Sequence, residues 1–234
     1  MVEGTDFSAS PVRSLAAHFS QRQFSLLPLQ ASLVFMQGVV LEESKSDLRR
    51  AMLSRRKSHV PANCYLWSRL IQSQALRLPQ YLAAKAVALY SPIENEVDTA
   101  AILADALERK KQILYPRIGD EDRPRFFEIS SPLELCPGRF GILEPAGAKC
   151  VSLTLVENLI IFVPGVAFDL CGHRLGRGVG WYDRLLKTLT NRALFVGLAY
   201  EFQLVEQVAT AKWDQDVHYV ITEKRVIDCG VSTP

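Results

Sequence analysis

Five short apolar runs recur along the 234-residue chain, and most are separated by segments long enough to form helices. The runs are residues 86–90, 113–115, 159–163, 194–199 and 217–222. Each is consistent with a buried strand that ends at polar or turn-forming residues. Strands that alternate with helices predict βαβ units in a mainly parallel sheet with helices on both faces. The expected fold class is α/β, with a Rossmann-like three-layer architecture in a single domain.

The polar pattern becomes helical from Ser44 onward. Ser44, with Asp47 three residues later, resembles a capping box. The apolar stripe that follows consists of Leu48, Met52 and Leu53. Basic residues at 49–50 and 55–57 lie mainly off this stripe, and we expect most of them to form a solvated helix face.

Glycine and arginine are densest in residues 163–184. An apolar run ends there at Pro164-Gly165, and a helical start follows at Trp181. The intervening glycines and arginines are Gly172, Gly176, Gly178 and Gly180 with Arg174 and Arg177. Glycine lets backbone N–H groups approach an oxyanion, and arginine is a forked phosphate donor. Strand, glycine loop and helix N-terminus together predict a phosphate site, although the spacing matches neither the P-loop nor the dinucleotide fingerprint. The alternative is a glycine-rich connection with two solvated arginines.

Other chemically distinctive residues also follow the predicted strands. Glu96, Arg117 and residues 200–203 each come at or after the end of an apolar run, as does the glycine-rich segment. Ligands of α/β sheets collect at the carboxyl ends of the strands. We therefore expect these residues to converge on one site.

One continuous motif resembles a known family. Residues 164–183 follow the pattern Pro-Gly-x-x-Phe-Asp-x-x-Gly-x-Arg-Leu-Gly-x-Gly-x-Gly-aromatic-Tyr-Asp. This is similar to the signature of the 5-formyltetrahydrofolate cyclo-ligase (5,10-methenyltetrahydrofolate synthetase) family. Shorter elements match in that family's order at residues 45–49, 96–99, 115–117, 140–145 and 197–203. The resemblance covers residues 44–226, and we expect one cyclo-ligase domain over residues 41–230.

The resemblance implies a ligase of one-carbon metabolism. It would convert 5-formyltetrahydrofolate to 5,10-methenyltetrahydrofolate, with release of ADP and phosphate. ATP would phosphorylate the formyl oxygen, and N10 of the same folate would then close the ring. The protein would mainly position the reactants and neutralise charge. The implied ATP-binding residues are Lys45, Arg49, Arg174, Gly176, Arg177, Gly178, Val179, Gly180, Trp181, Tyr182 and Asp183, with Arg177 and Asp183 also catalytic.

The resemblance also implies a magnesium cofactor held by Asp183 and Asp214. Magnesium prefers a few carboxylates together with phosphate oxygens and water, so one or two acids suffice. The alternatives are that Asp183 caps a helix, that Asp214 opens a turn, and that Lys45 is an exposed lysine near a helix start.

The folate site is implied at four residues: Glu96, Phe140, Trp181 and Tyr182. A carboxylate can accept paired hydrogen bonds from the amino group and ring N–H of a pterin, and aromatic rings can stack on it. The alternatives are a helix-start acid for Glu96 and core packing for the aromatic residues. The chain departs from the family pattern at Trp181, where tyrosine is usual, at Val179, where glycine or lysine is common, and at His218, where an acid is common.

Composition agrees with a soluble enzyme, and we expect a cytoplasmic monomer whose partners are small molecules. The chain is 48% hydrophobic with a net charge of +2, which gives no reason to expect binding to nucleic acid or to a membrane. No apolar stretch reaches 18 residues. The five cysteines are odd in number and lack C-x-x-C spacing, which argues against structural zinc or a disulfide framework and favours a reducing compartment.

Residues 1–40 differ in character from the rest. They are rich in serine and glutamine with scattered basic residues, and their composition is similar to that of a transit peptide. Two acids, Glu3 and Asp6, and weak periodicity argue against that role. We expect a flexible extension or a start codon placed too early.

Two other functions are compatible with the same residues. One is a non-catalytic domain of the same ancestry that binds nucleotide or RNA. The other is a different ATP-using enzyme, such as a kinase or ligase for a small acid, which shares only the phosphate site.

Overall fold

The computed structural model describes residues 44–118, 124–138, 141–147 and 149–234, which belong to one compact unit. The extension predicted for residues 1–40 and the predicted substrate residue Phe140 lie outside these residues. All five cysteines are described, and their thiols are free. Among the described residues, no helix has both the length and the apolar character needed to cross a bilayer.

Within the described residues, the central sheet has eight strands in the order β12-β11-β10-β7-β1-β2-β3-β6. Five neighbouring strands run parallel, which confirms the predicted sheet. They are β1 (Ala86–Ala88), β2 (Gln112–Ile118), β7 (Leu159–Pro164), β10 (Ala193–Leu198) and β11 (Tyr219–Ile221). The last strand is thus shorter than the predicted run over residues 217–222.

Strands that were not predicted from the apolar pattern pair antiparallel. At the sheet margins these are β3 (Pro124–Ile129), β6 (Cys150–Val151) and β12 (Val226–Asp228). Two further pairs form separate two-stranded sheets: β4 (Leu135–Pro137) with β5 (Leu143–Pro145), and β8 (Ala167–Phe168) with β9 (Arg174–Leu175). The glycine-rich segment therefore begins as a hairpin, and its open loop is confined to residues 176–180.

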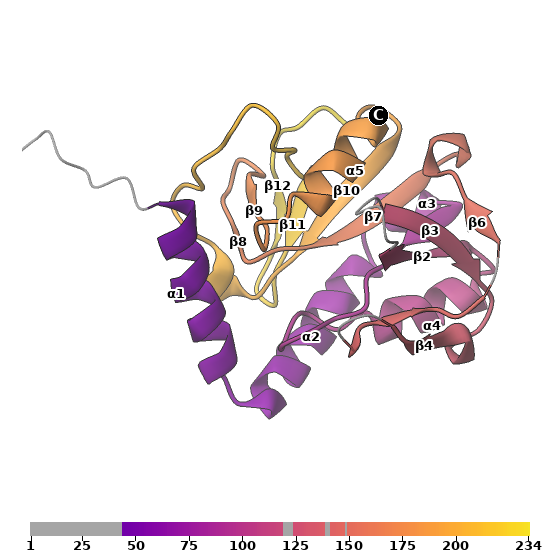
Figure 1. Ribbon diagram of the computed structural model, residues 1–234, viewed down its shortest axis with the longest axis horizontal. Coiled ribbons are helices and arrows are strands. Elements are labelled where there is room, and N and C mark those ends of the chain that lie inside the picture. Colours follow the sequence, from indigo (N-terminus) through magenta and orange to yellow (C-terminus); the bar gives the residue numbers. More distant parts are fainter. Residues whose placement is uncertain (1–43, 119–123, 139–140, 148) are drawn as a thin grey trace, which may run out of the picture. The chain divides into compact units, whose positions relative to one another are not determined.

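Helices cover both faces of the sheet, as predicted (Figure 1). One face carries α2 (Pro61–Ala75), α3 (Pro79–Ala83) and α4 (Ala100–Glu108), and the other carries α5 (Trp181–Leu189). Strand β1 shows why both layers are needed: Val87 packs in the core beneath α2 and α4, while Ala86 and Ala88 pack in the core beneath α5. Alternate strand residues point to opposite faces, so a wholly apolar strand requires cover on both.

Helix α1 (Lys45–Ser58) packs on the β8–β9 hairpin through Met52, which contacts a cluster containing Val166 and Leu175. Its start is the predicted one, because Ser44 is the N-cap and its hydroxyl accepts from the Asp47 amide at 3.2 Å. Short 3₁₀ turns are Pro132–Glu134, Leu153–Leu155 and Glu201–Gln203.

The strand order creates a crevice beside β1. The chain runs from β1 to β2 on one side, and later returns to place β7 on the other side, with Ala88 paired to Ile161. The connection that follows β1 and the connection that follows β7 lead away from each other at the carboxyl ends of these strands. Ligands of α/β proteins bind in the crevice that such a divergence leaves. The segments after β1 and β7 are therefore those that hold Glu96 and the glycine loop.

Candidate active site

A cavity of about 390 Å³ lies between the segments that follow β1 and β7. One wall comes from the β1–α4 connection, including Tyr90 and Glu96, and another from residues 174–183. Leu143 and Glu144 of β5 complete the lining beside Pro116 of β2. The volume falls within the usual range for small-molecule sites. Of the four elements expected to converge, Glu96 and the glycine-rich segment meet at this cavity, whereas Arg117 and residues 200–203 are not part of its lining.

The glycine loop and the first residues of α5 form part of the wall of this cavity. Gly180 is the N-cap of α5 with φ of 68°, and Gly178 has φ of 105°, both in the left-handed region. The first amides of a helix lack intrahelical acceptors and carry partial positive charge. The amides of residues 181–183 begin α5 at the cavity wall, so the site is suited to an anion.

Arg177 extends from the glycine loop to the opposite wall. Its Nε and Nη2 donate to Oε1 of Glu96 at 3.2 and 3.1 Å, and its Nη1 donates to Glu94 at 2.9 Å. The side chain is 35% exposed, whereas that of Glu96 is 8% exposed. The predicted phosphate donor and the predicted folate acceptor are therefore in direct contact.

Arg174 occupies a different position from Arg177. It belongs to β9, is 6% exposed, and donates from Nη2 to Oδ1 of Asp183 at 2.8 Å. Its guanidinium also lies over the ring of Tyr182, 5.5 Å from the centroid. Burial raises the pKa of the Tyr182 hydroxyl well above its ordinary value, so this group acts only as a neutral hydrogen-bonding partner.

The aromatic residues of the site form part of α5. Trp181 and Tyr182 line the cavity and meet edge to face with centroids 4.8 Å apart. The indole Nε1 of Trp181 is buried and has no hydrogen-bond partner among the described residues. A buried donor without a partner is costly, so a ligand acceptor at this atom would relieve the cost.

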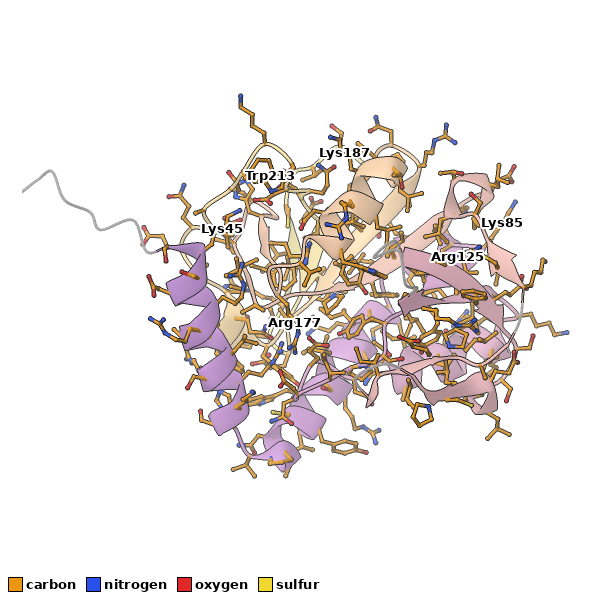
Figure 2. The ribbon with its side chains drawn as sticks, in the orientation of Figure 1. Lys45, Lys85, Arg125, Arg177, Lys187 and Trp213 are labelled. Carbon is orange, nitrogen blue, oxygen red and sulfur yellow. The ribbon has the colours of Figure 1, made fainter. Side chains whose placement is uncertain are left out.

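Neither of the two residues predicted on α1, Lys45 and Arg49, is part of the cavity lining. Arg49 donates from Nε to the carbonyl of Gly176 at 2.8 Å. Lys45 lies at the start of α1 (Figure 2). It forms an ion pair with Asp214, which also accepts from the Ala211 amide at 2.7 Å. Asp183 lines the cavity, whereas Asp214 does not. No group of three or more metal-ligating side chains is found in the described part of the chain.

Two arginines lie in surroundings that differ from those expected. Arg117, expected at the site, lies within β2, donates to the Gly147 carbonyl at 3.1 Å and is not part of the cavity lining. Its guanidinium stacks on the ring of Phe127, which belongs to the neighbouring antiparallel strand β3. Arg56, expected on a solvated face, is instead 2% exposed. Its burial depends on partners that no local pattern reveals.

Gln203 is the described residue of the 200–203 element that supports the glycine-rich segment directly. Its Nε2 donates to the carbonyls of Gly165 and Val166 at 2.9 and 3.0 Å. A Cβ on Gly165 would lie 2.4 Å from the ring of Phe168, so this turn requires glycine. The turn where β7 ends is thus fixed from two sides.

Comparison with known proteins agrees with this architecture. The model of the 5-formyltetrahydrofolate cyclo-ligase family matches residues 41–223. The chain belongs to this family. As a cyclo-ligase family member it is an enzyme, and its relatives include the 5-formyltetrahydrofolate cyclo-ligases of Haemophilus influenzae and Mycolicibacterium smegmatis. The first is 35% identical over 62% of this chain and 79% of its own length, and the second is 30% identical over 79% and 96%.

Among solved structures, the cyclo-ligase chain is similar to 5,10-methenyltetrahydrofolate synthetase from Aquifex aeolicus. The TM-score is 0.71 with 37% identity, and the match covers 81% of this chain and 95% of the other. The predicted fold class and family are both confirmed. The roles of individual site residues stay predictions.

Proposed function

We propose that this enzyme converts 5-formyltetrahydrofolate to 5,10-methenyltetrahydrofolate at the cost of one ATP. The observation that carries the proposal is the contact between Arg177 and Glu96, because it brings a phosphate donor and a pterin acceptor to one cavity. The names of the relatives point to the same substrate and product.

The reaction has two steps that need both ligands in one place. The formyl oxygen attacks the γ-phosphorus of ATP, and ADP leaves. N10 then attacks the formyl carbon, the C–O bond breaks with release of phosphate, the N10 proton is lost, and the ring closes. Neither step requires a covalent bond to the protein, so its contribution is to position the reactants and neutralise charge.

On the phosphate side, the amides at the start of α5 and the guanidinium of Arg177 are donors at the cavity wall. Arg177 is 35% exposed and sits on a loop with two left-handed glycines, so it can exchange Glu94 and Glu96 for phosphate oxygens. Arg49 supports the loop through the Gly176 carbonyl and adds positive charge behind it.

On the folate side, Glu96 accepts from the pterin once Arg177 has turned away. Its Oε1 then becomes available to paired donors, while Oε2 is held by the Ile93 amide at 3.2 Å. Tyr182 and Trp181 supply flat apolar surface, and the indole N–H of Trp181 adds a donor.

Magnesium fits one carboxylate of this site. Asp183 lines the cavity next to the helix start where phosphate is expected, and its partner Arg174 already orients it. A bound ion would neutralise phosphate charge and would take its remaining ligands from phosphate oxygens and water. Asp214 pairs with Lys45 away from the cavity lining, so we assign it a weaker contribution.

The direct test is to incubate the purified full-length protein with ATP, magnesium and 5-formyltetrahydrofolate. The proposal expects the near-ultraviolet absorbance of the methenyl product to grow in step with ADP. Folate binding without turnover would indicate a non-catalytic relative, and ADP formation that does not depend on the folate would indicate a different ATP-using enzyme.

A further inference from the structure

Arg56 is a buried guanidinium that none of the roles above uses. It lies in the last turn of α1, where its neighbours Arg55 and Lys57 are both exposed, yet Arg56 itself is 2% exposed. Its Nη2 lies 3.5 Å from Oε1 of Glu96, and its Nη1 donates to the Gly165 carbonyl at 3.3 Å. Arg56 is not part of the cavity lining, so it stands behind the wall.

Stability alone does not explain why the guanidinium of Arg56 is buried. A buried charge must be paired, and even a paired one often adds nothing compared with an apolar side chain of similar volume. Here burial lowers the pKa of the Arg56 guanidinium, with Glu96 opposing the shift, and its Nε has no hydrogen-bond partner among the described residues. The features that remain to be explained are its two contacts, with Glu96 and with Gly165.

Those contacts join the two walls of the cavity. Glu96 belongs to the segment after β1, whereas Gly165 begins the segment after β7. The Gly165 carbonyl also accepts from Gln203, and the turn cannot accommodate a Cβ, so this anchor point is rigid. A guanidinium has fixed fork geometry. Arg56 thereby connects Glu96, the proposed pterin acceptor, to the Gly165 turn that leads into the glycine-rich segment.

Glu96 is also shared between two cations of different mobility. Its Oε1 contacts both Arg56 and Arg177, and the latter is on an exposed loop. In the proposed reaction Arg177 turns to the phosphates, and the carboxylate loses that partner. Arg56 cannot follow, because it is enclosed and bonded to Gly165.

We infer that Arg56 is a positioning residue for the folate: it supplies the counter-charge to Glu96 and fixes its carboxylate against the Gly165 turn while Arg177 serves the phosphates. This inference rests on the proposed function. Arg56 acts through Glu96 and does not itself contact the substrate. Its removal should therefore affect folate binding selectively, whereas a purely structural role would weaken both ligands.

The test compares Arg56→Gln and Arg56→Lys with the exposed neighbour variant Arg55→Gln. Dissociation constants for 5-formyltetrahydrofolate and for ADP with magnesium are measured separately by calorimetry. Arg56→Gln should weaken folate binding by about tenfold or more and leave ADP binding nearly unchanged, because it removes a charge-assisted contact. Lysine keeps the charge but loses the fork, so Arg56→Lys should restore part of the affinity. Arg55→Gln should match the wild type.

A double variant decides whether the effect passes through Glu96. In a Glu96→Gln background, Arg56→Gln should cause little further loss of folate affinity, which is non-additivity in a double-mutant cycle. Additive losses, or equal losses for folate and ADP, would overturn the inference. If Arg56→Gln does not fold, Arg56→Lys decides, since it too should weaken folate more than ADP. A wild-type protein that binds ADP but no folate would overturn the proposed function itself, and the Arg56 inference with it.

Discussion

Arg177 and Glu96 neutralise each other across the cavity, with both Nε and Nη2 of the guanidinium directed at the single oxygen Oε1. The residue proposed for the phosphates and the residue proposed for the pterin are thus one another's partners when neither ligand is present. Each ligand has to displace this contact, so substitutions on its two sides should have separable consequences.

Arg177→Ala should lose most turnover and keep its fold, because the side chain is partly exposed and belongs to none of the core clusters of the described residues. By analogy with other arginines in phosphoryl transfer, kcat/KM should fall by about 10³-fold. Steady-state kinetics with thermal unfolding checks this. Lys187→Ala is the matched control, since Lys187 is an exposed cation in the last turn of α5, the helix that follows the glycine loop (Figure 2). Activity close to wild type in Arg177→Ala would contradict its assignment.

Glu96→Gln should weaken 5-formyltetrahydrofolate binding more than nucleotide binding. The change replaces one strong acceptor with an amide that presents a donor toward pterin donors. Glu94→Gln is the control, because Glu94 also pairs with Arg177 but does not line the cavity. Separate binding titrations for the two ligands measure the difference. Equal losses for both would instead mean that Glu96 maintains the structure.

The metal assignment predicts a graded response among three acids. Asp183→Asn should depress turnover steeply and raise the magnesium requirement, because Asp183 lines the cavity. Asp214→Asn should have a milder effect, since this carboxylate pairs with Lys45. Asp216→Asn should be nearly indifferent, because Asp216 is not part of the cavity lining. Magnesium titrations of activity compare the three. An unchanged requirement in Asp183→Asn would leave that residue as a helix-start acid.

Gly165→Ala should destabilise the protein and reduce folate affinity together. The added Cβ would lie 2.4 Å from the Phe168 ring, and relief of that overlap must move the turn to which Arg56 and Gln203 are bonded. Overpacking of this kind costs about 1–3 kcal/mol, measurable by urea unfolding. Gly147→Ala is the control, since its Cβ would meet nothing within 4 Å in the described part of the chain. Unchanged stability in Gly165→Ala would show that Phe168 can yield.

The parallel strands, and the meeting of Glu96 with the glycine-rich segment, were predictable because the sequence signals for them are local. An apolar run such as residues 159–163 can be satisfied only by burial on both faces, and glycines followed by a helix start are typical of an anion site. The marginal strands were not predictable in the same way. β6 spans only Cys150–Val151, and its existence depends on the strand that it pairs with.

The sequence was least informative about the surroundings of individual arginine and lysine side chains. Arg55, Arg56 and Lys57 are consecutive and chemically alike, yet only Arg56 is buried. What distinguishes it is a carboxylate 40 residues later and a carbonyl 109 residues later along the chain. Arg174 was likewise expected in an open loop, but its pairing on β9 turns it toward Asp183. Only the tertiary contacts separate these residues from their neighbours.

The attachment of α1 has a consequence for how the protein is made. Its residues Arg56, Arg49 and Lys45 contact Gly165, Gly176 and Asp214. These partners come 109, 127 and 169 residues later in the chain. A ribosome adds roughly 5–20 residues per second, so several seconds pass between the synthesis of this helix and that of its docking partners. During that interval Arg56 has no buried environment to enter, and the cavity proposed as the active site lacks one of its supports. We therefore expect nascent chains stopped before residue 176 to bind neither ligand, even though three of the five central parallel strands have already been synthesised.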